Sequence, residues 1–256
     1  MPYLTAGDPD LATTARLIEA VDQAGASVIE VGFPFSDPVA DGPTIQASMT
    51  YALDHGVRIA GIFDAVRTAR SNVEAGLVAM VSFSMVHRYG VERFVSDAAA
   101  AGFDGFIFPD LPIESAGPVR QAVADAGLTL SMLIAPTTSD ERARAIAAAS
   151  TGFVYVVSRS GITGEQAQLP AELPERLKKL REATALPLAV GFGIAEAAQV
   201  RQVVELADAA IVGSALVRRV SQHRQAGCEP LAAEAAAFVR ELATGLEPAA
   251  DSRIGA

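Results

Sequence analysis

One repeated unit limits the folds that are open to this chain: an Ala-rich amphipathic stretch, then a glycine, then a short run of β-branched and apolar residues. The unit is clearest where Gly25, Gly102 and Gly127 precede such runs. Glycine readily adopts the left-handed conformation that ends many helices. Each copy of the unit therefore predicts a helix that stops at the glycine and a strand that follows it.

Eight apolar runs, separated by helical patterns, are candidate strands. They cover residues 2–5, 28–32, 77–83, 105–108, 129–134, 153–157, 187–190 and 209–212. Eight strands that alternate with helices in 256 residues predict an α/β fold of the (β/α)8 TIM-barrel class, and a six-stranded doubly wound sheet is the structural alternative. No low-complexity linker divides the chain, so we expect residues 1–256 to form a single barrel domain with a loosely held tail from about residue 245.

Charge and composition exclude several classes of function. The net charge of -10 would repel nucleic acid and anionic membrane surfaces, so we expect neither as a partner. Half of the residues are hydrophobic, yet no run of about 18 uncharged apolar residues could span a membrane, and no signal-peptide pattern opens the chain. We therefore expect a cytoplasmic location. Cys228 is the only cysteine and the three histidines stand apart, so we expect no metal site.

Two carboxylates lie where barrel enzymes place their reactive groups, at a strand end and in the loop after it. If Ile29 and Val31 face the surrounding helices, the two-residue period of a strand turns Glu30 into the barrel mouth. Desolvation there should raise the pKa of Glu30 toward neutrality, which suits a group that donates and accepts a proton. Asp41 follows a Pro-rich loop that could fold back over the same mouth. The structural alternative is that Glu30 pairs with an inward-facing Arg or Lys and that Asp41 belongs to an ordinary turn.

Glycine-containing segments after three later strands indicate an anion site. The loop 158–164 carries two glycines and three hydroxyl residues, which suits an anion cradle, a closing lid or an ordinary surface loop. Segments 190–194 and 212–215 each run from a strand end through glycine into a predicted helix. Free N–H groups at helix N-termini bind phosphate without Lys or Arg, and a standard barrel phosphate site is built from the loops after strands seven and eight. We therefore predict a phosphate site at these two segments.

The stretch from Glu30 to Gln46, EVGFPFSDPVADGPTIQ, closely resembles the signature of the tryptophan synthase α-subunit family. Further matches follow in family order and near family spacing at residues 4–9, 110–112, 155–164, 191–193 and 213–215. The resemblance thus covers nearly the whole chain. It implies a (β/α)8 barrel lyase of tryptophan biosynthesis, which cleaves indole-3-glycerol phosphate by a retro-aldol reaction into indole and glyceraldehyde 3-phosphate.

The resemblance also implies roles for individual residues. Glu30 would protonate the indole ring carbon and take the proton from the side-chain hydroxyl. Asp41 would hydrogen-bond the indole N–H and stabilise the positively charged intermediate. The remaining residues would contact the substrate: Gly164, Phe192, Gly193, Gly213 and Ser214 would hold the phosphate, Tyr3 and Tyr155 would lie near the substrate, and Thr163 would belong to a closing loop.

The family partner is a β subunit that binds pyridoxal phosphate. The resemblance therefore implies an αββα heterotetramer in which the β subunit holds that cofactor. It implies no cofactor in this chain.

Two departures from the family pattern leave alternatives open. The family has a helix before the first strand, whereas this chain starts almost at the strand, so either its start was assigned too late or the barrel lacks this N-terminal helix and its floor is covered differently. Ser82 and Ser84 stand where the family usually has a tyrosine and an asparagine. The chain could thus be a stand-alone paralogue that releases free indole, or chiefly an allosteric activator of a β subunit. Another sugar-phosphate barrel enzyme, such as an isomerase, is a further alternative.

Overall fold

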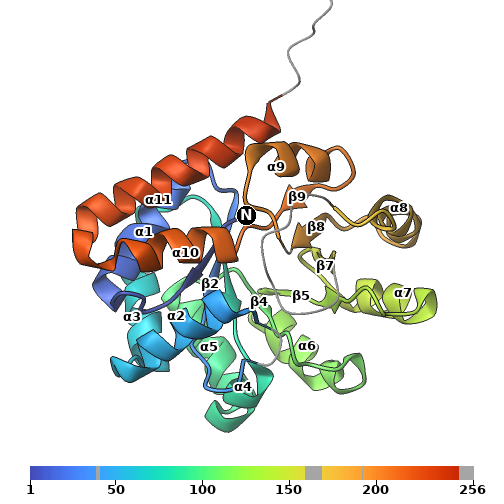
Figure 1. Ribbon diagram of the computed structural model, residues 1–256. Coiled ribbons are helices and arrows are strands. Elements are labelled where there is room, and N and C mark those ends of the chain that lie inside the picture. The colour runs from blue at the N-terminus through green and yellow to red at the C-terminus, as the bar shows by residue number, and fades with distance from the viewer. Residues whose placement is uncertain (39–40, 159–168, 192, 248–256) are drawn as a thin grey trace, which may run out of the picture.

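The computed structural model describes residues 1–38, 41–158, 169–191 and 193–247. In this part, nine parallel strand segments alternate with helices that surround them (Figure 1). The strands are β1 (Tyr3–Thr5), β2 (Val28–Gly32), β3 (Gly76–Met80), β4 (Gly105–Ile107), β5 (Thr129–Ser131), β6 (Leu133–Ile134), β7 (Val154–Val157), β8 (Leu188–Gly191) and β9 (Ala209–Ala210).

Two parallel sheets close into one barrel. β1 to β5 form the first sheet in chain order, and β6 to β9 form the second. Only Met132 separates β5 from β6, and its carbonyl accepts the Tyr155 N–H of β7 at 3.1 Å, so these two segments form one interrupted barrel strand. On the other side, Pro2 pairs with Val212, and the Tyr3 N–H donates to the Val212 carbonyl at 2.9 Å. The resulting ring of eight barrel strands confirms the predicted TIM barrel and excludes the doubly wound sheet.

The helices lie outside the ring of strands (Figure 1). They are α1 (Leu11–Gln23), α2 (Pro43–Asp54), α3 (Ile59–Arg70), α4 (Phe83–Tyr89), α5 (Val91–Ala101), α6 (Ala116–Asp125), α7 (Asp140–Ala149), α8 (Leu173–Ala183), α9 (Ala197–Val204), α10 (Ser214–Gln222) and α11 (Cys228–Ala243). Three short 3-10 helices are η1 (Ile113–Ser115), η2 (Arg224–Ala226) and η3 (Thr244–Leu246).

Capping residues set the ends of several helices. The Asp10 carboxylate accepts the Thr13 N–H at 2.7 Å and so begins α1. The predicted glycine stops are confirmed, because Gly25, Gly102 and Gly127 have positive φ angles of 97°, 98° and 70°. A strand follows each of them, so the unit that recurs in the sequence is also the unit of the fold.

The third strand ends earlier than the apolar run indicates. The predicted strand 77–83 is too long, because β3 ends at Met80 and Phe83 already begins α4. The Phe83 N–H and the Ser82 hydroxyl donate to the Asp110 carboxylate, at 2.6 and 2.7 Å, instead of pairing with a strand. A side chain from the next βα unit thus ends the strand.

Alternate side chains of each strand divide the interior into two layers. Ile29 and Val31 of β2 are fully buried in the large core between the strands and the helices. Glu30, between them, points into the barrel, as predicted. A smaller apolar cluster fills the barrel interior: Val78, Ile107, Phe153, Tyr155, Ala189 and Ile211.

The end of the barrel where the strands start encloses a cavity of about 540 Å³. Met1, Val28 and Phe153 line it from the strand side. Leu242 of α11 and Leu246 of η3 line it from outside the ring, and Leu246 is 57% exposed. The last helices of the described chain therefore cover part of this floor.

The described chain ends in a packed segment. Gly245 of η3 is buried against α9, where an added Cβ would collide with the Ala197 carbonyl. The rest of the tail that we predicted to be loosely held, residues 248–256, lies outside the described residues. None of the helices in the described ranges is both long enough and apolar enough to cross a membrane.

Gly25 and Gly102 form a matched pair that separates backbone strain from crowding. Their φ angles are nearly equal, but a Cβ on Gly102 would lie 2.5 Å from Arg70 Cγ, whereas a Cβ on Gly25 would meet nothing within 4 Å. Arg70 is held in place by bonds to Asp104 and to the Ala75 carbonyl. We expect Gly25→Ala to lower the free energy of unfolding by about 1 kcal/mol and Gly102→Ala by about 2 to 3 kcal/mol, as measured by urea titration. Equal losses would contradict this account of packing at Gly102.

Candidate active site

Glu30 occupies an unusual position for a charged residue. It lies in the middle of β2, opposite Tyr3 of β1 and Val78 of β3, and it is 0% exposed. Neither carboxylate oxygen has a hydrogen-bond partner among the described residues. An ion pair with an inward-facing Arg or Lys, the structural alternative for this residue, is thus not found in the described part of the chain.

Burial without a partner changes the acidity of Glu30. Desolvation penalises the charged form and raises the pKa of this carboxyl to about 8, while the nearby amino group of Met1 acts in the opposite direction. The direction agrees with the expectation from the sequence. Near neutral pH the group is mostly protonated, so it can donate a proton and then act as a base.

Asp41 lies in the loop between β2 and α2 and reaches the same cavity as Glu30. Its N–H donates to the Pro38 carbonyl at 3.2 Å, and its carbonyl accepts the side-chain amide of Gln46 at 2.7 Å. Burial raises the pKa of the Asp41 carboxyl to about 6. Two carboxyl groups with separate pKa values thus share one cavity, an arrangement typical of acid–base catalysis.

Two tyrosines, Tyr3 and Tyr155, line the wall of this cavity. Each lies across a glycine of the neighbouring strand: a Cβ on Gly32 would collide with the Tyr3 ring, and a Cβ on Gly191 would collide with that of Tyr155. Burial raises the pKa of both phenols above the usual range, so both stay neutral. The Tyr3 hydroxyl is buried and has no hydrogen-bond partner among the described residues.

The start of α10 forms one end of the cavity. Gly213 and Ser214 line it there, together with Gly193 from the loop after β8. Of the described residues that line the cavity, none is a lysine or an arginine. An anion would therefore be held by backbone N–H groups and by the helix dipole. The described residues also contain no group of three or more His, Cys, Asp or Glu side chains that could hold a metal ion.

The two glycine segments predicted to bind phosphate lead into different structures. α10 begins directly after Gly213, as predicted. After β8, however, α9 begins only at Ala197, and Glu196 and Gln199 form a capping box at its N-terminus. The helix predicted after this segment thus starts later than the segment indicates, and side chains satisfy its N-terminus. Gly193 therefore contributes loop backbone to the cavity.

Three predicted site residues, Thr163, Gly164 and Phe192, lie outside the described residues. The cavity also contains residues that the sequence reasoning missed. They are Ile45, Met80, Pro109, Leu133 and Ile211. The rule that barrel ligands meet the carboxyl ends of strands could have found Met80 and Ile211. No such signal exists for Ile45, which reaches the cavity from a helix.

Ser82 and Ser84 lie at the rim of the barrel, beyond the end of β3. Their hydroxyl oxygens are 2.7 Å apart, and Ser82 also donates to Asp110. Neither serine is among the described residues that line the cavity. The departure from the family pattern at these positions therefore concerns the link between α4 and the loop after β4.

The chain resembles known proteins over nearly its whole length. A family model described as tryptophan synthase alpha chain matches residues 1–247. Tryptophan synthase alpha chains of Chloroflexus aggregans and Thermosynechococcus vestitus are 46% and 44% identical to it, over 96% of this chain and 92% and 91% of theirs. Among solved structures, tryptophan synthase of Mycobacterium tuberculosis is 36% identical with a TM-score of 0.87, covering 97% of this chain and 92% of that one. A mutant tryptophan synthase alpha-subunit of Pyrococcus furiosus is 35% identical with a TM-score of 0.86, covering 95% and 96%.

The raised pKa of Glu30 predicts how stability depends on pH. The folded chain keeps a proton up to about pH 8 that the unfolded chain releases near its ordinary pKa of 4.5, so ionisation favours the unfolded state between these values. The parent should lose on the order of 3 to 4 kcal/mol of unfolding free energy between about pH 5 and pH 8 through this group. Glutamine does not titrate. We therefore expect Glu30→Gln to be more stable than the parent at pH 8 by about that amount, and nearly equal to it at pH 5.

Urea unfolding of both proteins at the two pH values measures this difference. Glu92→Gln, which changes an exposed carboxylate at the start of α5, serves as the control and should show no such pH-dependent gain. A Glu30→Gln effect of the same size at both pH values would show that Glu30 is not held protonated.

Proposed function

Since the chain belongs to the tryptophan synthase alpha chain family, we propose that Glu30 and Asp41 carry out its reaction at the barrel mouth. The family reaction is the cleavage of indole-3-glycerol phosphate, a lyase step of tryptophan biosynthesis. One observation supports these roles above others: an unpaired, fully buried Glu30 carboxyl shares its cavity with the Asp41 carboxyl. Such a pair supplies an acid, a base and a counter-charge in one apolar site.

The first step makes the indole ring a better leaving group. Glu30, protonated near neutral pH, donates its proton to the ring carbon that carries the glycerol phosphate side chain. The positive charge that forms is centred on the ring nitrogen. Asp41, ionised above about pH 6, accepts a hydrogen bond from the indole N–H and stabilises this charge.

The second step breaks the carbon–carbon bond. Glu30, now ionised, takes the proton from the hydroxyl on the side-chain carbon next to the ring. The O–H electrons form the carbonyl of glyceraldehyde 3-phosphate, and the electron pair of the broken bond returns to the ring and neutralises its nitrogen. Glu30 ends protonated, as it began, so one carboxyl group serves both steps without net proton exchange.

The other residues of the cavity would hold the substrate. Tyr3 and Tyr155 offer aromatic walls for the indole, and the start of α10 offers N–H groups for the phosphate. We assign the phosphate to Gly193, Gly213 and Ser214. On the family resemblance we also propose Gly164 and Phe192 for the phosphate and a role for Thr163 in closure over the substrate.

We also propose a complex with a tryptophan synthase β subunit in an αββα arrangement. The family resemblance and the similarity to the Mycobacterium tuberculosis tryptophan synthase support this proposal. Pyridoxal phosphate would then be bound by the β subunit and not by this chain. The cytoplasm is the location that we propose for the complex.

Substitution of the two carboxylates tests their roles directly. We expect Glu30→Gln to lower the kcat of indole release from indole-3-glycerol phosphate by about 10²- to 10⁴-fold, because it removes the acid and the base. Asp41→Asn should lower kcat by about 10²- to 10³-fold, because the charge on the ring nitrogen loses its counter-charge. Ser84→Ala, at the rim, is the control and should stay close to the parent.

The assay is run with and without a β subunit, which separates the alternatives left open by the sequence. Release of indole by the isolated chain at the full rate would indicate a stand-alone enzyme. An inert chain that still activates the β subunit would indicate an activator. Full activity in both Glu30→Gln and Asp41→Asn would overturn the proposed mechanism.

The two pKa values belong to the chain without substrate, so they predict a bell-shaped dependence of kcat/KM on pH. Activity should rise as Asp41 loses its proton near pH 6 and fall as Glu30 loses its proton near pH 8. In Asp41→Asn the residual activity should keep the alkaline limb and lose the acidic one. Steady-state rates of indole formation at pH values on both sides of these two pKa values measure both limbs. If the acidic limb persists in Asp41→Asn, it belongs to a group other than Asp41.

A further inference from the structure

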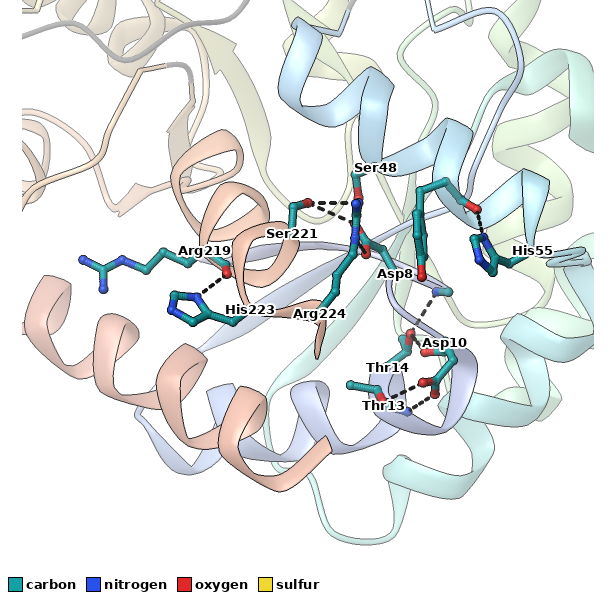
Figure 2. Close-up of polar contacts among 12 residues, drawn as sticks. Asp8, Asp10, Thr13, Thr14, Ser48, His55, Arg219, Ser221, His223 and Arg224 are labelled. Atoms are coloured by element: carbon teal, nitrogen blue, oxygen red, sulfur yellow. Dashed lines mark hydrogen bonds and ion pairs between the residues drawn. The ribbon is translucent and has the colours of Figure 1, made fainter. Parts of the chain in front are cut away.

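A buried ion pair lies beside the barrel mouth, outside the cavity. Asp8 follows β1 and is 1% exposed, and Arg224 lies in η2, just beyond the end of α10. Arg224 donates to both oxygens of the Asp8 carboxylate, from Nε at 2.6 Å and from Nη2 at 2.7 Å (Figure 2). A two-pronged pair of this kind fixes geometry as well as charge.

Helix α2 is attached to the same carboxylate. Ser48 of α2 donates to Asp8 at 2.5 Å, and Ser221 of α10 donates to it at 3.2 Å. Figure 2 shows Ser48, Ser221 and Arg224 gathered around Asp8. The Arg224 guanidinium also stacks on the ring of Tyr51 in α2, 3.8 Å from its centroid. Asp8 therefore joins the last turn of α10 to the middle of α2.

These two helices both begin at the catalytic cavity. α2 starts at Pro43, just after Asp41, and α10 starts at Ser214, at the end proposed for the phosphate. An apolar cluster packs the two helices against each other and against β1. Its buried members are Tyr3, Ile45, Met49 and Val217.

We propose that Asp8 and Arg224 form a clamp that holds α2, and with it Asp41, in a fixed position relative to the start of α10. Both are positioning residues, since neither lines the cavity in the described part of the chain. A helix rises about 1.5 Å per residue, so Ser48 lies only about 8 Å along α2 from Pro43, which follows Asp41 after one residue, and a rotation of α2 at the clamp would move the carboxylate. The inference rests on the proposed catalytic role of Asp41.

One contact of the clamp can be removed without leaving the buried Asp8 carboxylate unpaired. Loss of the Arg224 side chain would leave the buried Asp8 carboxylate without its counter-charge, which can unfold a protein. Ser48→Ala removes only the hydrogen bond from α2 to Asp8, because Asp8 keeps its bonds to Arg224 and Ser221, and the stacking of Arg224 on Tyr51 remains. Arg224→Lys keeps the positive charge but loses the planar fork and its stacking on Tyr51.

Arg219 supplies a matched control on the same helix. It pairs with Glu234 at 2.8 Å and stacks over Phe238 at 4.2 Å, and both of these residues belong to α11. Arg219 thus makes the same kinds of contact as Arg224, but it joins α10 to α11 and not to α2. Arg219→Gln should therefore destabilise the fold without moving Asp41.

Steady-state indole release by the full chain, below the unfolding temperature of every variant, tests the clamp. We expect Ser48→Ala and Arg224→Lys to lower kcat about tenfold, because small misplacements of a catalytic group cost one to two orders of magnitude in rate. KM should stay within about twofold of the parent, because the start of α10 is unchanged. Arg219→Gln should keep kcat within about twofold of the parent, even if its melting temperature falls as much as those of Ser48→Ala and Arg224→Lys.

The pH profile distinguishes positioning from a general loss of stability. Tyr3, Glu30 and Tyr155 share the cavity with Asp41, and burial there raises the pKa of its carboxyl. A released α2 would let water reach Asp41 and lower this pKa. The acidic limb of kcat/KM should therefore move to lower pH by about one unit in Ser48→Ala, and it should not move in Arg219→Gln.

Two outcomes separate the clamp from the proposed function. If Ser48→Ala keeps the parent kcat and acidic limb while Asp41→Asn is inactive, the clamp inference is wrong and the catalytic role of Asp41 stands. If Asp41→Asn is as active as the parent, the proposed function itself fails. Should Arg224→Lys not fold, Ser48→Ala alone decides the first question.

Discussion

A carboxyl group enclosed by a ring of parallel strands is the constraint around which the barrel mouth is organised. Each strand of a closed barrel is hydrogen-bonded on both sides, so its side chains alternate between the outer core and the interior. Ile29 and Val31 occupy the outer core, and Glu30 between them is fully buried and lines the cavity at the mouth. The same burial that costs the fold stability supplies an acid that works near neutral pH.

The rest of the cavity is consistent with keeping Glu30 unpaired. A lysine or arginine for the phosphate would also attract the Glu30 carboxylate and lower its pKa. The described lining instead offers the N-terminus of α10, which attracts an anion through N–H groups and a partial charge. Asp41 comes from a loop, so the second carboxyl can be close to the substrate without sharing the strand of the first. The position of that loop depends on α2, and α2 is tied to α10 through Asp8 and Arg224.

Much of the fold was predictable because it depends on neighbours in the chain. The glycine stops and the inward direction of Glu30 both follow from local periodicity. The end of β3 does not, because it depends on Asp110 of the next unit, which binds the Phe83 N–H. The ion pair between Asp8 and Arg224 joins positions 216 residues apart, and no periodicity connects them. The direction of the Glu30 pKa could be predicted from burial alone, whereas the missing ion pair could be seen only in three dimensions.

The protonation state of Glu30 can be observed directly by infrared difference spectroscopy of the parent and Glu30→Gln. The difference isolates the C=O stretch of this one protonated carboxyl, followed from about pH 4 to pH 10 across the ordinary and shifted pKa values. We predict a signal that persists through neutral pH and is lost with an apparent pKa of about 8. A signal that is lost near the ordinary pKa of 4.5 would show that the barrel does not keep Glu30 protonated, and would contradict the proposed first step of the reaction.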